Sequence, residues 1–83
     1  MKIKLDGDAG KQLRRLNEPA LSRIAKAIDG LAKEPPDGDI RRLKGLDGFR
    51  LRVGGYRIFF RDMDGIRFVY KIAPRGGAYG GNK

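Results

Sequence analysis

The sequence contains no cysteine, no histidine and no tryptophan. Without cysteine there are no disulfide bonds or thiolate zinc sites, and without histidine the commonest metal ligand and acid–base side chain is missing. No Ser/His/Asp arrangement and no glycine-rich loop of the usual nucleotide-binding types is present. We therefore expect no metal and no cofactor, so any chemistry has to use arginine, lysine or tyrosine.

Long apolar runs are missing as well. No run approaches the ~18 apolar residues of a membrane span, and the opening MKIKL is too short for a signal peptide. We expect no membrane partner and a soluble chain in the cytoplasm. A chain of 83 residues buries only about 60% of its unfolded surface, so residues 1–83 are expected to form a single domain with one thin core.

Charge is divided unevenly along the chain. The formal net charge is +9, and residues 41–83 hold eleven basic and three acidic side chains, against eight and seven in residues 1–40. All seven aromatic side chains lie in the same second part. This balance indicates a polyanionic partner, either nucleic acid or an anionic membrane surface, because a charge that merely maintains solubility would not be segregated.

The first half of the chain predicts one short strand and two helices. Residues 1–5 alternate apolar and basic side chains as a half-buried strand does, and Asp6 follows as a helix cap. Apolar residues then recur at helical spacing in two stretches, 9–16 and 21–32. The segment EPPDG, residues 34–38, ends the second helix and opens a polar connection to the next strand.

A β-hairpin is the clearest feature of the second half. Apolar side chains alternate with arginines through FRLRV and YRIFFR, on either side of a Gly-Gly pair. Two glycines between such runs predict a two-residue turn of the primed type. This turn places Arg52 opposite Arg57, and Arg50 opposite Phe59.

The following turn decides which side chains of the last strand meet the core. A three-residue loop, MDG at 63–65, keeps the apolar side chains of both strands on one side, whereas a two-residue loop would mix the faces. We therefore expect Arg61 opposite Arg67, with Val69 on their face. The residues expected to point to the core are Ile66, Phe68, Tyr70 and Ile72.

These elements predict an α+β fold, in which two N-terminal helices pack on one face of a twisted, mainly antiparallel four-stranded sheet. The other face of the sheet is then open to solvent. Pro74 ends the last strand, and the glycine-rich residues 74–83 are expected to form a flexible tail.

The open face is expected to carry a row of cations. Its predicted members are Arg50, Arg52, Arg57, Arg61, Arg67 and Lys71. Like charges opposite one another destabilise a sheet by roughly a few tenths to 1 kcal/mol per pair, so fold stability does not account for them. A string of phosphates does, because arginine donates paired hydrogen bonds to phosphate. Phe59 and Tyr79 are candidates to stack on RNA bases; the alternative is a solvated face with Phe59 packed on arginine stems.

The run DIRRLKGLDGFRLRVGGYRIFFR, followed by PRGGAY, resembles the RelE/ParE toxin superfamily, and most specifically the RelE-type ribosome-dependent mRNA interferases. The similarity covers nearly the whole chain. It implies the toxin of a type II toxin–antitoxin system, an endoribonuclease that enters the ribosomal A site, cuts mRNA through a ribose 2′-OH and inhibits translation. It also implies a cognate antitoxin as partner, with the ribosome and mRNA as targets.

The resemblance assigns roles to individual residues. Arg57 matches the arginine that stabilises the phosphate in the transition state, Arg75 one that contacts phosphate or the leaving group, and Tyr79 the tyrosine that orients the nucleotide. Arg50 and Arg52 stand where close members have lysines, one of them the proposed base. The expected catalytic set is Arg50, Arg52, Arg57, Arg75 and Tyr79. The expected RNA-binding set is Lys44, Phe59, Arg61, Arg67 and Lys71.

Arginine at the two lysine positions changes the implied chemistry. A guanidinium stays protonated at any physiological pH, so neither Arg50 nor Arg52 is an effective general base. The reaction would then rely on charge stabilisation alone, on Lys44 or Tyr79, or on groups of the ribosome. Two alternatives to the interferase follow: a ParE-like toxin that inhibits DNA gyrase by binding, without catalysis, and a catalytically weak homologue that only binds RNA or its antitoxin.

Overall fold

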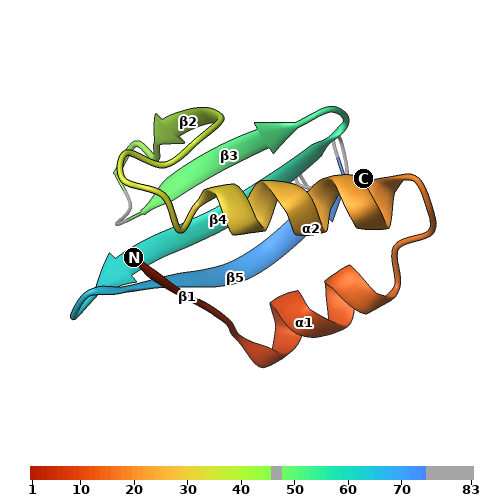
Figure 1. Cartoon of the computed structure of the whole chain (residues 1–83), viewed down its shortest axis with the longest axis horizontal. Coiled ribbons are helices and arrows are strands. Elements are labelled where there is room, and N and C mark those ends of the chain that lie inside the picture. The colour runs from red at the N-terminus through yellow and green to blue at the C-terminus, as the bar shows by residue number, and fades with distance from the viewer. Residues whose placement is uncertain (46–47, 75–83) are drawn as a thin grey trace.

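The computed structural model describes residues 1–45 and 48–74, and two helices pack on one face of a five-stranded sheet (Figure 1). The elements in chain order are β1 (Lys2–Leu5), α1 (Gly7–Arg14), α2 (Ala20–Gly30), β2 (Asp39–Arg42), β3 (Phe49–Val53), β4 (Tyr56–Met63) and β5 (Ile66–Pro74). The strands lie in the order β1-β5-β4-β3-β2, with β1 parallel to β5 and the other neighbours antiparallel. The predicted α+β class and the helix layer are confirmed, whereas the predicted number of four strands is wrong.

The strand that the sequence pattern did not predict is β2, at one edge of the sheet. Three of its four residues are exposed, and Ile40 is its one apolar side chain, so DIRR shows no alternation typical of a strand. Pairing with β3 places Ile40 opposite Leu51, at the margin of the core. This edge strand therefore depends on the pairing that β3 offers rather than on its own pattern.

The first helix, α1, begins and packs for identifiable reasons. Asp6 caps α1, because its side chain accepts a hydrogen bond from the backbone N–H of Asp8 at 3.0 Å. The small side chain of Ala9 is fully buried where α1 packs on β5. Neither helix within residues 1–45 and 48–74 is long and apolar enough to cross a membrane.

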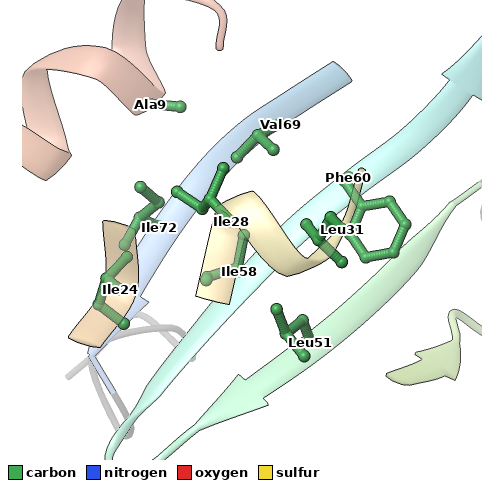
Figure 2. Close-up of a cluster of buried hydrophobic side chains, with 9 residues drawn as sticks. All are labelled: Ala9, Ile24, Ile28, Leu31, Leu51, Ile58, Phe60, Val69 and Ile72. Atoms are coloured by element: carbon green, nitrogen blue, oxygen red, sulfur yellow. The ribbon is translucent and has the colours of Figure 1, made fainter. Parts of the chain in front are cut away.

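The core lies between α2 and the central strands (Figure 2). Ile24, Ile28 and Leu31 recur at helical spacing and are at most 5% exposed. They meet buried side chains of β3, β4 and β5, which are Leu51, Ile58, Phe60, Val69 and Ile72. Full burial of one such side chain contributes about 1.5–3 kcal/mol, so this cluster holds the helix layer against one face of the sheet.

The turn between β4 and β5 differs from the prediction. Its loop consists of Asp64 and Gly65, because Met63 pairs directly with Ile66. Both loop residues have positive φ, 53° and 76°, as a type I′ turn requires. The predicted three-residue loop is therefore wrong, and the two-residue loop would mix the faces of the two strands if the pairing continued unbroken.

A β-bulge in β5 restores the match. Phe59 pairs with Lys71, whereas the next residue, Phe60, pairs with Val69, so Tyr70 is an extra residue on β5. The strand therefore presents the opposite set of side chains on the two sides of the bulge. Ile72, beyond the bulge, points to the core as predicted.

Between the bulge and the turn, the faces of β5 are reversed with respect to the prediction. Val69 and Arg67 lie on the helix side and are 0% and 6% exposed. The expected core positions Ile66, Phe68 and Tyr70 are instead partly exposed. A shift of one residue in the pairing of β4 with β5 thus moves a whole set of side chains to the other face.

Candidate functional site

The face of the sheet opposite the helices, called the open face below, carries a cluster of cations. Leu51 and Ile58 point to the helices, so their neighbours along β3 and β4 point the other way. The predicted residues that the register places on the open face are Arg50, Arg52, Arg57, Phe59, Arg61 and Lys71. Their placement is confirmed, and their roles in RNA binding and cleavage stay predictions.

The β3–β4 hairpin brings two guanidinium groups to one pocket. Arg52 lies directly opposite Arg57, and Arg50 opposite Phe59, as predicted. Gly54 has φ 56°, the backbone conformation that a two-residue primed turn needs at its first position. A pocket of about 390 Å³ lies at the turn between β3 and β4 and is called the hairpin pocket below. It is lined by Arg52, Gly54, Gly55, Tyr56 and Arg57. Two cations beside a polar pocket of this size suit a phosphate group.

The edge strand β2 adds a cation that the sequence pattern did not identify. Arg41 is exposed and lies directly opposite Arg50. Its position is visible only once β2 is known to pair with β3. Arg41 is 3.7 Å from a carboxylate oxygen of Asp39, but both side chains are at least half exposed, and such pairs contribute little. Among the strand residues of the described chain, Asp39 is the one carboxylate on the open face.

This arrangement costs stability. The pairs Arg52 with Arg57 and Arg41 with Arg50 each oppose two like charges, at a cost of roughly a few tenths to 1 kcal/mol. The Nε of Arg50 is buried and makes no hydrogen bond within the described residues, and an unsatisfied buried donor costs about 1–3 kcal/mol. Asp39 lies opposite Arg52 on its other side and offsets part of this cost. The remaining like-charge pairs are explained by a polyanionic ligand rather than by fold stability.

Arg67 does not belong to this cluster, and its predicted placement on the open face is wrong. The bulge in β5 turns it to the helix side, where it is 6% exposed. Its Nε and Nη2 donate to the two carboxylate oxygens of Asp62 at 2.7 and 2.8 Å, and its Nη1 donates to the carbonyl of Leu31 at 2.7 Å. Arg67 therefore connects β4 and β5 with the C-terminal end of α2.

Hydrogen bonding also shifts the pKa values of Asp62 and Arg67. The bidentate hydrogen bond from Arg67 holds the pKa of the Asp62 carboxyl below its ordinary value of 3.8. The same bond raises the pKa of the Arg67 guanidinium. Both groups are therefore charged at neutral pH, and they neutralise each other away from the open face.

The remaining predicted site residues lie elsewhere. Lys44 is exposed in the turn between β2 and β3. Arg75 and Tyr79 lie outside the described residues, as does the predicted tail from residue 75 onward. Pro74, predicted as the first residue of that tail, is the last residue of β5.

A larger cavity, of about 530 Å³, lies on the helix side between α2 and β3. Its rim mixes charges, because Asp29 and Asp37 accompany basic side chains and Lys33 forms an ion pair with Asp37 at 2.9 Å. This cavity shares Arg52 with the hairpin pocket. A mixed rim does not concentrate positive charge, so the hairpin pocket is the better candidate for an anionic ligand.

The open face can bind anions and stabilise negative charge. Guanidinium groups donate bidentate hydrogen bonds to phosphate oxygens and stay charged at any physiological pH. The described residues of the cluster are arginines and Lys71, and they include no histidine or carboxylate. The cluster can therefore stabilise negative charge on a bound anion, and its described residues offer no side chain of the kinds that usually accept a proton at neutral pH.

Residues 3–79 match the family described as the ParE toxin of the type II toxin–antitoxin system parDE. The RelB–RelE antitoxin–toxin complex from Methanococcus jannaschii is similar with a TM-score of 0.77 and 22% identity, covering 90% of this chain and 93% of that chain. The isolated E. coli RelE toxin gives a TM-score of 0.75 and 20% identity, over 89% of this chain and 83% of that chain. A RelBE toxin–antitoxin complex from Mycobacterium tuberculosis gives a TM-score of 0.71 and 20% identity, over 89% of this chain and 96% of that chain. A comparison with curated proteins gave no match.

The family match spans nearly the whole chain, from within β1 to beyond the end of β5. At about 20% identity, the likeness to these solved structures shows a shared fold and nothing more. The chain therefore belongs to the RelE/ParE superfamily of type II toxin–antitoxin toxins, in the family described as ParE toxin.

Proposed function

We propose that this toxin is a ribosome-dependent endoribonuclease that cleaves mRNA in the A site. The observation that carries the proposal is the convergence of Arg50, Arg52 and Arg57 on one open face beside a pocket. Such a surface fits RNA, because each phosphate that it neutralises releases counterions and adds affinity without base specificity. The site of action would be the cytoplasm, where translating ribosomes present single-stranded mRNA.

The proposed reaction needs no metal, because the substrate carries its own nucleophile. The 2′-oxygen of one ribose attacks the adjacent phosphorus, the bond from phosphorus to the 5′-oxygen breaks, and the products are a 2′,3′-cyclic phosphate and a 5′-OH. Arg57, with Arg52 opposite it, stabilises the negative charge that develops on the non-bridging oxygens. The mRNA has to be held so that the 2′-oxygen and the leaving oxygen are in line, which the ribosome and the open face would do together.

Proton transfer is the part of the reaction that the described cluster does not supply. The proton of the 2′-OH has to leave, and the 5′-oxygen has to gain one. Arg50 and Arg52 remain protonated, so we propose that Lys44, Tyr79 or ribosomal groups complete the transfer. This division predicts slow or no cleavage of free RNA and fast cleavage on the ribosome.

A second candidate function is inhibition of DNA gyrase without catalysis. The observation that favours it is the family match, whose description is that of a ParE toxin. The cation cluster would then contact the partner enzyme or its DNA. The absence of a lysine at positions 50 and 52 is compatible with this function, because binding needs no general base.

We also propose a cognate antitoxin as partner. The family description names a toxin–antitoxin system, and the similar structures from M. jannaschii and M. tuberculosis are toxin–antitoxin complexes. An antitoxin that covers the open face would remove the toxin from both RNA and gyrase. Growth arrest on induction of the toxin, relieved by co-expression of its operon partner, is the expected result.

Induction of the toxin in growing cells separates the two functions. We expect mRNA 5′ ends that map within codons and carry a 5′-OH, while DNA synthesis continues at first. Intact mRNA together with an early block of replication would instead support gyrase inhibition and reject the nuclease. Lys26→Ala, which removes an exposed cation from α2 on the other side of the sheet, is the matched control and should cut as wild type.

A further inference from the structure

The bulge in β5 places aromatic side chains beside the cation cluster. The ring centroid of Tyr70 lies 6.2 Å from that of Phe59, with the two planes inclined by 34°. The Nζ of Lys71 lies 5.8 Å from the Phe59 centroid. Phe68 lies opposite Arg61, on the open face, and all three rings are partly exposed.

The charges around these rings have one sign. Lys2 and Lys4 are exposed on β1 and lie opposite Ile66 and Phe68 of β5, while Ile3 between them packs against the core. This part of the open face has no carboxylate among its strand residues in the described chain. Asp39 lies on β2, at the opposite edge of the sheet.

The rings lie close to the hairpin pocket, which Arg57 lines. Phe59 follows Arg57 by two residues on β4 and shares its face, so the two positions are about 7 Å apart. This spacing is comparable to the separation of neighbouring nucleotides in an extended strand. A strand of RNA with one phosphate at Arg57 would therefore carry its next base over Phe59.

We propose that Phe59, Tyr70 and Phe68, with Lys71, form a stacking platform for a base of single-stranded RNA next to the nucleotide held by the arginine cluster. This inference rests on the proposed nuclease function, which identifies the ligand as RNA. Aromatic rings interleaved with cations are typical of surfaces that bind single strands, where each stacked base contributes about 1–3 kcal/mol. A protein partner fits less well, because lysine is depleted in protein–protein interface cores and Lys71 lies against the central ring.

The test compares two probes that share a phosphate backbone and differ in bases. The full-length toxin is titrated with a labelled short oligoadenylate, and with the same oligonucleotide carrying abasic sites at its central positions, and binding is followed by fluorescence anisotropy. The arginine cluster should bind both probes. The platform should make wild type bind oligoadenylate about 5- to 100-fold more tightly than the abasic probe.

Leucine substitutions remove the aromatic ring while keeping apolar bulk. Phe59→Leu and Tyr70→Leu are each expected to bring the preference for oligoadenylate close to unity, whereas Tyr70→Phe should keep it. Arg61→Gln should weaken binding of both probes equally and leave the preference unchanged. Thermal unfolding of each variant shows that it is folded, and if Phe59→Leu does not fold, Tyr70→Leu decides.

Several outcomes would overturn the platform. These are equal binding of both probes by wild type, no binding of either, or a full preference retained in the folded leucine variants. Leucine variants that keep the base preference but lose antitoxin binding would make this face a protein-binding surface instead. If the base preference and its loss are both observed while induced cells show no mRNA cleavage, the platform stands and the nuclease proposal fails.

Discussion

Arg67 and Arg57 lie on neighbouring strands of one sheet, but on opposite faces and in opposite surroundings. Arg67 is 6% exposed and donates to both carboxylate oxygens of Asp62 and to the carbonyl of Leu31. Arg57 lies opposite another arginine, Arg52, at a polar pocket. The difference shows that the same residue type serves the fold on one face and lines a surface suited to a polyanion on the other.

The location of carboxylates explains this division. Asp62 shares the helix side with Arg67, so the charge there is neutralised, and the carboxylate satisfies a guanidinium that would be costly to bury alone. On the open face, Arg50 and Arg52 have no carboxylate within salt-bridge distance among the described residues. Their field therefore extends into solvent, which attracts an anionic ligand at long range.

The largest expected effect is on activity, through Arg57→Ala. Loss of one group that stabilises transition-state charge lowers rates by about 100- to 1000-fold, so ribosome-dependent cleavage should fall by that factor. The variant should remain folded, because the core side chains of β4 are unchanged and the like-charge pair with Arg52 is relieved. Both are measured on purified toxin, with primer extension on programmed ribosomes and urea unfolding. A fully active Arg57→Ala variant would show that Arg57 does not stabilise the transition state.

Asp62→Ala should have the converse effect, on stability instead of activity. Removal of one partner leaves the Arg67 guanidinium buried without its carboxylate, and this costs about 3–5 kcal/mol in a fully buried pair. Because Asp62 is 32% exposed, we expect the low end, about 3 kcal/mol by urea unfolding. Asp39→Ala, which breaks an exposed pair, is the control and should cost less than about 1 kcal/mol. Equal effects of the two substitutions would contradict the structural role of Arg67.

The pH dependence of stability gives a second test of the ion pair between Asp62 and Arg67. The pKa of Asp62 is lower in the folded state than its ordinary value of 3.8, so the folded state binds this proton less readily than the unfolded state. The stabilisation is therefore fully present well above that ordinary value, and it is lost progressively as the pH falls through 3.8 toward the lowered pKa. Wild type should lose more stability over this range than Asp62→Asn, as followed by thermal unfolding. Parallel pH profiles of the two proteins would show that the pair contributes nothing.

The smallest expected effect is on the salt dependence of RNA binding. For a single strand, removing one cation that neutralises a phosphate reduces the slope of log affinity against log salt by about 0.7. Arg52→Gln should show a reduction of this size in anisotropy titrations with oligoadenylate, and Lys26→Gln on α2 should show none. An unchanged slope for Arg52→Gln would remove it from the phosphate-binding surface.

Local patterns predicted much of the fold correctly. The stripe of Ile24, Ile28 and Leu31 defined the helix layer, and the alternation around the Gly-Gly turn gave the pairing of Arg52 with Arg57. These features are determined by residues close in sequence. They sufficed to place most of the cation cluster on the open face.

The errors arose where pairing, rather than local pattern, decides the structure. β2 has almost no apolar alternation and forms on the edge of β3. The face of β5 depends on a bulge at Tyr70, which no turn residue or glycine marks in the sequence. As a result Arg67 was assigned to the RNA surface, whereas the rings of Phe68 and Tyr70 were assigned to the core. The two-residue loop at Asp64 and Gly65 places Asp62 opposite Arg67, and this pairing of opposite charges was the signal that favoured it.

The side-chain Nε–Hε resonances of the arginines test the central claim most directly. In an NMR titration of the toxin with single-stranded RNA, the account predicts that the signals of Arg50, Arg52 and Arg57 shift, while that of Arg67 stays unchanged. Shifts at Arg67 without shifts at these three arginines would contradict the assignment of RNA binding to the open face.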